Sequence, residues 1–174
     1  MSEEAHVIHK KIGEILRKAI PASSSLTLLQ DVACGGKQRI PLFCRPKKSR
    51  INEYCNVDML IIKHDKIKGI IEIEESNVKP TQICGKFLTS ALSKYYIHES
   101  EGNKPVEMAD SVVFIQIVDT SKLKRGKTAK FKQWKTLEDS INCILPVENS
   151  HVKQYKLLTS DDLGQLDAII RDIS

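Results

Sequence analysis

The sequence of 174 residues lacks any apolar run long enough to cross a bilayer, which argues against a membrane-spanning helix. Its N-terminus, MSEEAHVIHKK, is charged and has none of the apolar core that a signal peptide requires. Internal repeats and low-complexity segments are also lacking. These absences predict a cytoplasmic protein with no membrane partner.

Cysteine pairs of the Cys-x-x-Cys type are absent too, and the five cysteines are odd in number. This pattern predicts reduced, mostly buried thiols in a cytoplasm. A zinc site built from Cys34, Cys44, Cys55 and His64 is the alternative, but its spacing matches no common zinc motif. The triplet GKT at 126–128 lacks the upstream glycine of a phosphate-binding P-loop, so no nucleotide cofactor is expected.

What the chain does contain is typical of a globular domain, with 41% hydrophobic and 28% charged residues. Its length suits one domain with a sizeable core, and we expect a single domain over residues 1–174. The net charge of +5 is modest but unevenly distributed along the chain.

The stretch over residues 56–76, NVDMLIIKHDKIKGIIEIEES, predicts two β-strands joined by a tight, charged turn. The run from 57 to 62 is almost continuously apolar, as in a strand covered on both faces, and the His-Asp-Lys segment at 64–66 supplies turn residues. In the second run, Glu72 and Glu74 alternate with isoleucine and therefore project from one face. Pairing across the turn can bring Asp58 close to that acidic face.

Carboxylates gathered on a mostly apolar sheet are costly unless a positive group lies among them. A hard cation that prefers carboxylate oxygens meets this need, so we expect Mg²⁺ at Asp58, Glu72 and Glu74, with Mn²⁺ able to substitute. The alternative is an exposed hairpin whose acids lie in water beside Lys63, Lys66 and Lys68.

Asp58, followed after thirteen residues by Glu72-Ile73-Glu74, resembles the signature of the PD-(D/E)xK nuclease superfamily, the restriction-endonuclease-like proteins. Val57 replaces the usual Pro, and Glu74 occupies the usual Lys position, as in the Glu-x-Glu variant of some restriction endonucleases. The resemblance covers about residues 5–120 and implies an α/β fold with an αβββαβ core, in which helices flank a central mixed sheet. It also implies that Asp58 and Glu72 hold the metal, while Glu74 orients or deprotonates a water or binds a second metal.

The periodicity of the chain gives the same order of helix, strands, hairpin, helix and strand. The expected helices cover residues 3–20, 81–98 and 137–145, with a last helix that begins after 160; the expected strands cover 24–32, 39–44, 57–62, 70–74, 111–118 and 154–158. Residues 99–110 are expected to form a loop, and the basic segment over 121–135 leads into the C-terminal helices.

Two helices offer further site residues. The resemblance implies that an acid of the first helix reaches the metal, and Glu14 is the candidate, with a solvated surface position as its alternative. Lys86 or Lys79, in the helix after the acidic strand or its approach, could supply the cation missing at position 74, although surface lysines are common on helices. We therefore include Lys86 among the catalytic candidates.

Basic residues gather in two segments that could contact phosphates. One alternative is that these charges are merely solvated; another is that Phe131 and Trp134, which interleave with the second segment, belong to the core. We expect Trp134 to pack inward and the lysines to face DNA. The candidate contacts are Arg45, Lys47, Lys48, Arg50, Lys79, Gln82, Lys122, Lys124, Arg125, Lys127 and Lys130.

The function that these features predict is a Mg²⁺-dependent DNA endonuclease. The resemblance favours a type II restriction endonuclease, which would cut a specific double-stranded site as a homodimer. Two alternatives remain open: a structure-specific nuclease, such as a Holliday-junction resolvase or a repair nickase, and an inactive DNA-binding module of the same fold.

Overall fold

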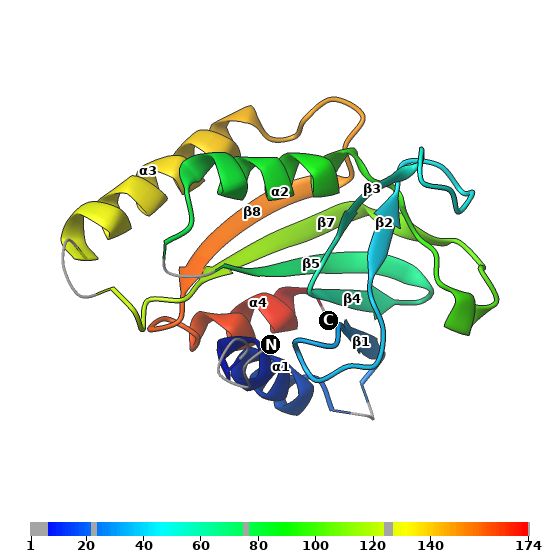
Figure 1. Cartoon of the computed structure of the whole chain (residues 1–174), viewed down its shortest axis with the longest axis horizontal. Coiled ribbons are helices and arrows are strands. Elements are labelled where there is room, and N and C mark those ends of the chain that lie inside the picture. Colours follow the sequence, from blue (N-terminus) through cyan, green and yellow to red (C-terminus); the bar gives the residue numbers. More distant parts are fainter. Residues whose placement is uncertain (1–6, 22–23, 75–76, 124–126, 174) are drawn as a thin grey trace.

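A computed structural model describes residues 7–21, 24–74, 77–123 and 127–173. The fold is α/β, with an open, mixed sheet of eight strands and four α-helices in the described part of the chain (Figure 1). In chain order the elements are α1 (Val7–Ala19), β1 (Leu26–Gln30), β2 (Pro41–Phe43), β3 (Glu53–Asn56), β4 (Met59–Lys63), β5 (Lys66–Glu74), α2 (Pro80–Leu92), β6 (Tyr95–Tyr96), a 3-10 turn (Glu99–Glu101), β7 (Val106–Val118), α3 (Lys127–Ile144), β8 (Val152–Thr159) and α4 (Gln165–Ile173).

The centre of the sheet is formed by β5 and β7, which run parallel and are connected through α2. On one side of β5, the strands β4 and β1 continue the sheet in antiparallel fashion. On the far side of β7, the C-terminal half of this long strand pairs in parallel with β8, and its N-terminal end pairs with β6. The strands β2 and β3 extend the sheet beyond β6.

The predicted hairpin is present as β4 and β5, and its turn explains the register. His64 and Asp65 have φ angles of 49° and 57°, the left-handed conformation that a two-residue turn of type I′ requires at both central positions. Lys63 therefore pairs with Lys66 at the end of the ladder. This register carries Glu72 and Glu74 to the far end of β5, away from the turn.

Helices cover both faces of the sheet, α2 and α3 on one and α1 and α4 on the other (Figure 1). Each face has its own apolar core. Phe87, Phe114, Trp134 and Tyr155 belong to the α2/α3 core. The α1/α4 core is built around aliphatic side chains, among them Ile12, Leu16, Ile71, Ile115 and Ile170.

Several elements differ from the sequence-based expectation. The helix expected over 81–98 ends at Leu92, because the chain turns into β6, which pairs with both β2 and β7. The loop expected over 99–110 gives way to β7 at Val106, and β3 was not predicted. The helix expected from 137 begins at Lys127, so most of the basic segment is helical. Short strands that gain their partners from distant segments are not visible in local periodicity.

No helix in the described part of the chain is long and apolar enough to span a membrane. All five cysteines are free, but only Cys34 is buried, so the expectation of mostly buried thiols is wrong.

Candidate active site at the end of the β4–β5 hairpin

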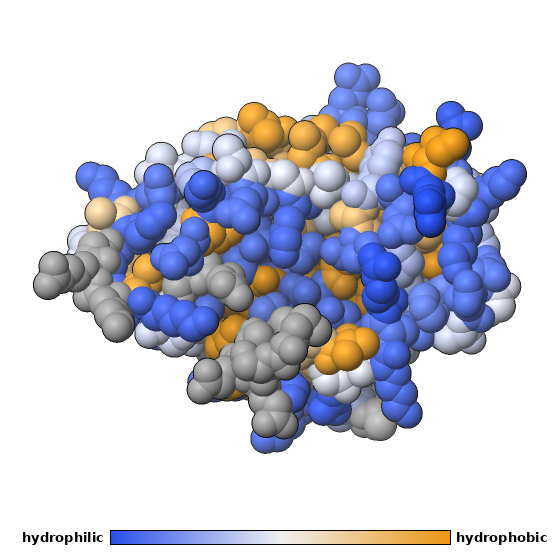
Figure 2. All heavy atoms as spheres, in the orientation of Figure 1, coloured by the Kyte–Doolittle hydropathy of each residue, from blue (hydrophilic) through white to orange (hydrophobic). Residues whose placement is uncertain are grey.

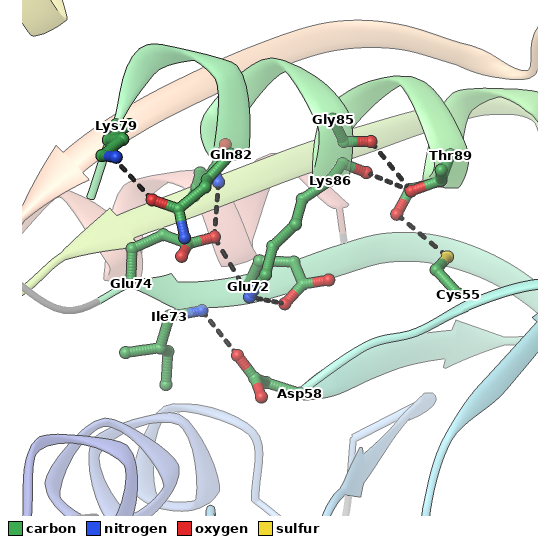
Figure 3. Close-up of polar contacts among 12 residues, drawn as sticks. Cys55, Asp58, Glu72, Ile73, Glu74, Lys79, Gln82, Gly85, Lys86 and Thr89 are labelled. Atoms are coloured by element: carbon green, nitrogen blue, oxygen red, sulfur yellow. Dashed lines mark hydrogen bonds and ion pairs between the residues drawn. The ribbon is translucent and has the colours of Figure 1, made fainter.

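The site begins where β4 and β5 part. The last pair in their ladder is Met59 with Ile71, beyond which Ile73 has no ladder partner in β4. The Ile73 N–H instead donates to Asp58 Oδ2 at 2.6 Å, so a carboxylate continues the ladder (Figure 3). This short bond to an acid just before β4 fixes Asp58 against the strand that carries the other two carboxylates.

Glu72 and Glu74 project from β5 towards α2, as their alternation with isoleucine predicts. Glu72 is 1% exposed and Glu74 is 6% exposed. The alternative of a hairpin whose acids lie in water is therefore wrong for these two residues. Buried carboxylates require compensation by a positive group or by hydrogen bonds.

That compensation comes from Lys86 on α2. Its Nζ lies 3.0 Å from Glu72 Oε2 and 3.1 Å from Glu74 Oε1, and so bridges the two acids (Figure 3). Of the two lysines considered from the sequence, Lys86 reaches the carboxylates. Lys79 is exposed at the start of α2, where its backbone N–H donates to Gln82 Oε1 at 3.0 Å.

Burial and charge act in opposite directions on this pair. Burial raises the pKa of Glu72 well above its usual range, and this outweighs the lowering by Lys86. Burial alone would lower the pKa of Lys86, but the carboxylates of Glu72, Glu74 and Asp58 raise it, so the ammonium stays charged. Glu72 Oε1 is buried and has no hydrogen-bond partner in the described part of the protein, which leaves one oxygen free to accept.

A second buried network holds Glu74 from the other side. Gln116 on β7 donates from Nε2 to Glu74 Oε1 at 2.7 Å, and Tyr155 on β8 donates its hydroxyl to Gln116 Oε1 at 2.9 Å. Gln116 is 0% exposed and Tyr155 is 1% exposed. Neither residue was predicted from the sequence, because an isolated Gln in a buried strand and a Tyr in another resemble ordinary core positions.

A pocket of about 440 Å³ opens beside Glu74 and Lys86. Its lining also includes His9 from α1 and Gln82 from α2. His9 shares the buried face of α1 with Ile12, Gly13 and Leu16, and this helical spacing could have identified it in the sequence. Glu14, the acid predicted to reach the metal from this helix, is exposed on another side of α1 and does not line the pocket.

The carboxylate oxygens of Asp58, Glu72 and Glu74 are the donors that Mg²⁺ prefers, and the unpartnered Glu72 Oε1 is available as a ligand. In the ion-free protein, however, these three acids do not form a group whose ligand atoms all lie within 4.8 Å of one another. Asp58 also belongs to a tighter group with Asp31 and Cys34, whose ligand atoms lie within 4.8 Å of one another. Burial, followed by the two aspartates, raises the pKa of the Cys34 thiol in the ion-free protein.

The zinc alternative is not supported. Among the described residues, Asp31, Cys34 and Asp58 form the one group of at least three potential ligands that lie this close together, so Cys34, Cys44, Cys55 and His64 are not brought to one point.

The first basic segment lies between β2 and β3, in a turn that projects from the sheet (Figure 1). Arg45, Lys47, Lys48 and Arg50 are all exposed there. Lys48 is paired with Glu99 at 2.6 Å, but no ion pair among the described residues engages Arg45, Lys47 or Arg50. These three cations are therefore free to meet an anionic partner.

The second basic segment is partly neutralised. Lys127 lies 3.8 Å from Asp161, and Lys135 lies 3.0 Å from both Glu138 and Asp139. Lys130 donates to the uncharged Gln133 at 3.4 Å. Lys122 is exposed, whereas Lys124 and Arg125 lie outside the described residues. Trp134 is buried and packs against Phe131 with ring centroids 5.6 Å apart, so it lies inward as expected and is not available to stack on a base.

Hydrophilic residues cover much of the face between α2 and α1 (Figure 2). An apolar strip follows the outer side of α2, where Leu88 and Leu92 are 46% and 45% exposed.

Comparison with known proteins identifies no relative, since no protein-family model, no curated protein and no solved structure matches the chain.

Proposed function

We propose that this protein is a Mg²⁺-dependent nuclease that hydrolyses DNA phosphodiester bonds. The observation that carries the proposal is the convergence of Asp58, Glu72, Glu74 and Lys86 at the end of the β4–β5 hairpin. Lys86 reaches this point from a different element and lies 3.0 Å and 3.1 Å from the two glutamates. Three acids and one lysine are the groups that phosphodiester hydrolysis with a bound cation needs, and two of the four, Glu74 and Lys86, line the pocket.

The order of elements supports a restriction-endonuclease-like core. In chain order, α1 is followed by the antiparallel strands β1, β4 and β5, then by α2 and by β7 parallel to β5. This is the αβββαβ arrangement, with β2 and β3 inserted between its first two strands. Asp58 directly precedes β4 and the two glutamates lie on the neighbouring strand β5, an arrangement that supports the resemblance to PD-(D/E)xK nucleases.

In this proposal Asp58 and Glu72 hold the cation, which when bound lowers the pKa of a water and polarises the scissile phosphate. Glu74 orients the attacking water from its place beside the pocket. Lys86 keeps its positive charge among the carboxylates and stabilises the additional negative charge that develops on the phosphate. Burial raises the pKa of Glu72, so a bound cation would favour the charged carboxylate that burial alone opposes.

The proposed substrate is double-stranded DNA, contacted first by the free cations of the β2–β3 turn. A type II restriction endonuclease that acts as a homodimer in the cytoplasm remains the specific form that we propose, because two copies would address both strands of a palindrome. A structure-specific nuclease would use the same carboxylates on a branched substrate.

One observation favours a second candidate, an inactive DNA-binding module. Lys86 forms ion pairs with both Glu72 and Glu74 without any metal ion, so the buried acids already have a positive partner in the ion-free protein. In such a module, the site would be a structural ion-pair cluster.

The deciding experiment incubates the protein with plasmid, bacteriophage lambda and four-way-junction DNA, with Mg²⁺ or with EDTA. Discrete fragments that appear only with Mg²⁺ indicate restriction, and cleavage of the junction alone indicates a structure-specific nuclease. Binding without cleavage in any arm would contradict the nuclease proposal. Asp58→Asn is the matched control, because the amide keeps an oxygen for the Ile73 N–H.

A further inference from the structure

A buried series of hydrogen bonds runs from Tyr155 through Gln116 to Glu74, and the function proposed above assigns no role to Tyr155 or Gln116. We infer that Gln116 and Tyr155 are positioning residues, which fix the direction of the Glu74 carboxylate. The inference deepens the proposed function and rests on it, because it assumes that Glu74 acts on a water or a cation.

The direction of the Gln116 amide is set by Tyr155. A carboxamide can present either its oxygen or its NH₂ to a neighbour, and only NH₂ can donate to a carboxylate. The Tyr155 hydroxyl donates to Gln116 Oε1 at 2.9 Å, which leaves Gln116 Nε2 to donate to Glu74 Oε1 at 2.7 Å. Burial raises the pKa of Tyr155, so the hydroxyl keeps its proton.

The tyrosine ring itself is held by aromatic packing. It stacks on Phe114 at an interplanar angle of 11°, with centroids 5.8 Å apart, and meets Phe87 edge to face at 5.3 Å. Because Phe87 lies one residue after Lys86 on α2, the same helix supports both the cation and the ring. The hydroxyl is therefore presented from a rigid base.

At the Glu74 end of this series of hydrogen bonds, the two carboxylate oxygens have different surroundings. Oε1 accepts from Gln116 and lies 3.1 Å from Lys86 Nζ. No hydrogen bond among the described residues engages Oε2, and Glu74 lines the pocket. Oε2 is thus the oxygen left to face a water or a cation, and its direction follows from the anchoring of Oε1.

Groups behind a functional carboxylate typically contribute tenfold to a hundredfold to metal affinity or activity. The test compares wild type with Gln116→Met, which keeps the length but removes the donor, with Tyr155→Phe, and with the double variant. Tyr54→Phe, at a tyrosine that is 45% exposed, is the matched control for loss of a hydroxyl. The measurements are kcat and KM for Mg²⁺-dependent cleavage, Mn²⁺ affinity by electron paramagnetic resonance, and thermal unfolding.

We expect Gln116→Met to lower kcat or to weaken Mn²⁺ binding by about tenfold to a hundredfold, with KM for the duplex within about twofold. Tyr155→Phe should have a smaller effect, since the amide then adopts the correct orientation only part of the time. The double variant should equal Gln116→Met, because Tyr155 acts on Glu74 only through Gln116.

Wild-type kcat and Mn²⁺ affinity in Gln116→Met would overturn the inference, and so would additive effects in the double variant. If Gln116→Met fails to fold, Tyr155→Phe alone decides, since it removes only a hydroxyl; no change in either quantity would then refute the inference. If wild type binds Mn²⁺ but cleaves no DNA, the proposed function fails while the Mn²⁺ measurements still test the positioning role. If wild type neither binds Mn²⁺ nor cleaves DNA, both proposals fail.

Discussion

The two faces of the central sheet are built from the same strands but bury different chemistry. Towards α1 and α4, the strands present Ile71 and Ile73 from β5 and Ile115 and Ile117 from β7, all in one apolar core. Towards α2 and α3, the neighbouring positions are Glu72, Glu74 and Gln116, which are equally buried. On the first face, these four positions of β5 and β7 pack with isoleucine alone.

The difference teaches which residues the fold does not need. Burying a carboxylate costs several kcal/mol unless it is paired, and even a paired one is often no better than an apolar residue. The α2/α3 face carries that cost at the end of β5, whereas Ile70, on the same face nearer the turn, packs as ordinary core. The polar cluster is therefore local, and its cost is best explained by a role other than folding.

The largest effect is expected for Asp58→Asn, which leaves both cores untouched. We expect cleavage to fall by at least about a hundredfold, because the anionic ligand is removed while the Ile73 N–H keeps an acceptor. The measurement is single-turnover cleavage with Mg²⁺, beside duplex binding with Ca²⁺ in its place. Cleavage at the wild-type rate would remove Asp58 from the proposed site.

Lys86→Met should be the most destabilising change on the polar face. It leaves Glu72 and Glu74 without their cation, which costs about 3–5 kcal/mol for a fully buried pair. Because 39% of the Lys86 side chain is exposed, we expect a smaller loss of about 2 kcal/mol. Urea unfolding at neutral pH in EDTA measures this loss. The same substitution in a Glu72→Gln background should cost less, and an equal cost would show that the two side chains are not coupled.

Glu72→Gln should stabilise the ion-free protein increasingly as pH rises. Burial raises the pKa of Glu72 in the folded state, so the folded state holds a proton that the unfolded state releases, and wild-type stability falls as pH rises from the ordinary pKa of 4.5 through the raised one. Gln does not titrate, so its advantage grows over this window by about 1.4 kcal/mol for each unit of pKa shift.

Unfolding by urea at several pH values, from about pH 4, where an ordinary glutamate titrates, up to about pH 8, tests this expectation. The raised pKa of Lys86 does not interfere, since its contribution disappears only above the ordinary lysine value of 10.5. Glu148→Gln, at an exposed position, is the matched control and should show no such trend. If the difference in unfolding free energy between Glu72→Gln and wild type does not depend on pH, the pKa of Glu72 is not raised in the folded protein.

Outside the cluster, Lys47→Gln and Arg50→Gln should weaken duplex binding without changing stability. Removing one cation that touches a phosphate lowers the slope of log affinity against log salt by about one. Lys10→Gln, at an exposed position on α1, is the control. Unchanged slopes in both turn variants would place the DNA elsewhere on the protein.

The smallest effect is expected on the apolar face. Ile115→Val lies next to Gln116 in β7 but points into the α1/α4 core, where removing one methyl group costs about 1 kcal/mol. Cleavage and Mn²⁺ affinity should not change. A loss of activity comparable to that of Gln116→Met would mean that β7 as a whole, and not its polar face, supports the site.

The sequence predicted the hairpin well because its determinants are local. Alternation placed Glu72 and Glu74 on one face, and the His-Asp pair at 64–65 favoured a tight turn. Lys86 could be proposed because it follows the acidic strand on the next helix. The general α/β architecture with a mixed sheet also followed from the order of the elements.

What could not be predicted depends on distant partners. Tyr95 and Tyr96 form a strand because they lie between β2 and β7, and no local pattern shows this. Gln116 could not be identified because its hydrogen-bond partners, Glu74 and Tyr155, are 42 and 39 residues away along the chain. On the first helix, we considered acidic residues and therefore chose Glu14, which is exposed. The residue of this helix that is buried and lines the pocket is His9.

The length of β7 links two parts of the protein that would otherwise be separate. Its first residues pair with β6, and through β6 with the strands that carry the basic turn, while residues 112–118 lie between β5 and β8. This one strand therefore sets the spacing between the exposed cations and the buried acids, and its register against β5 shifts between residues 108 and 113. Inserting or deleting a residue between 107 and 112 would alter that spacing, even if every side chain on either side were preserved.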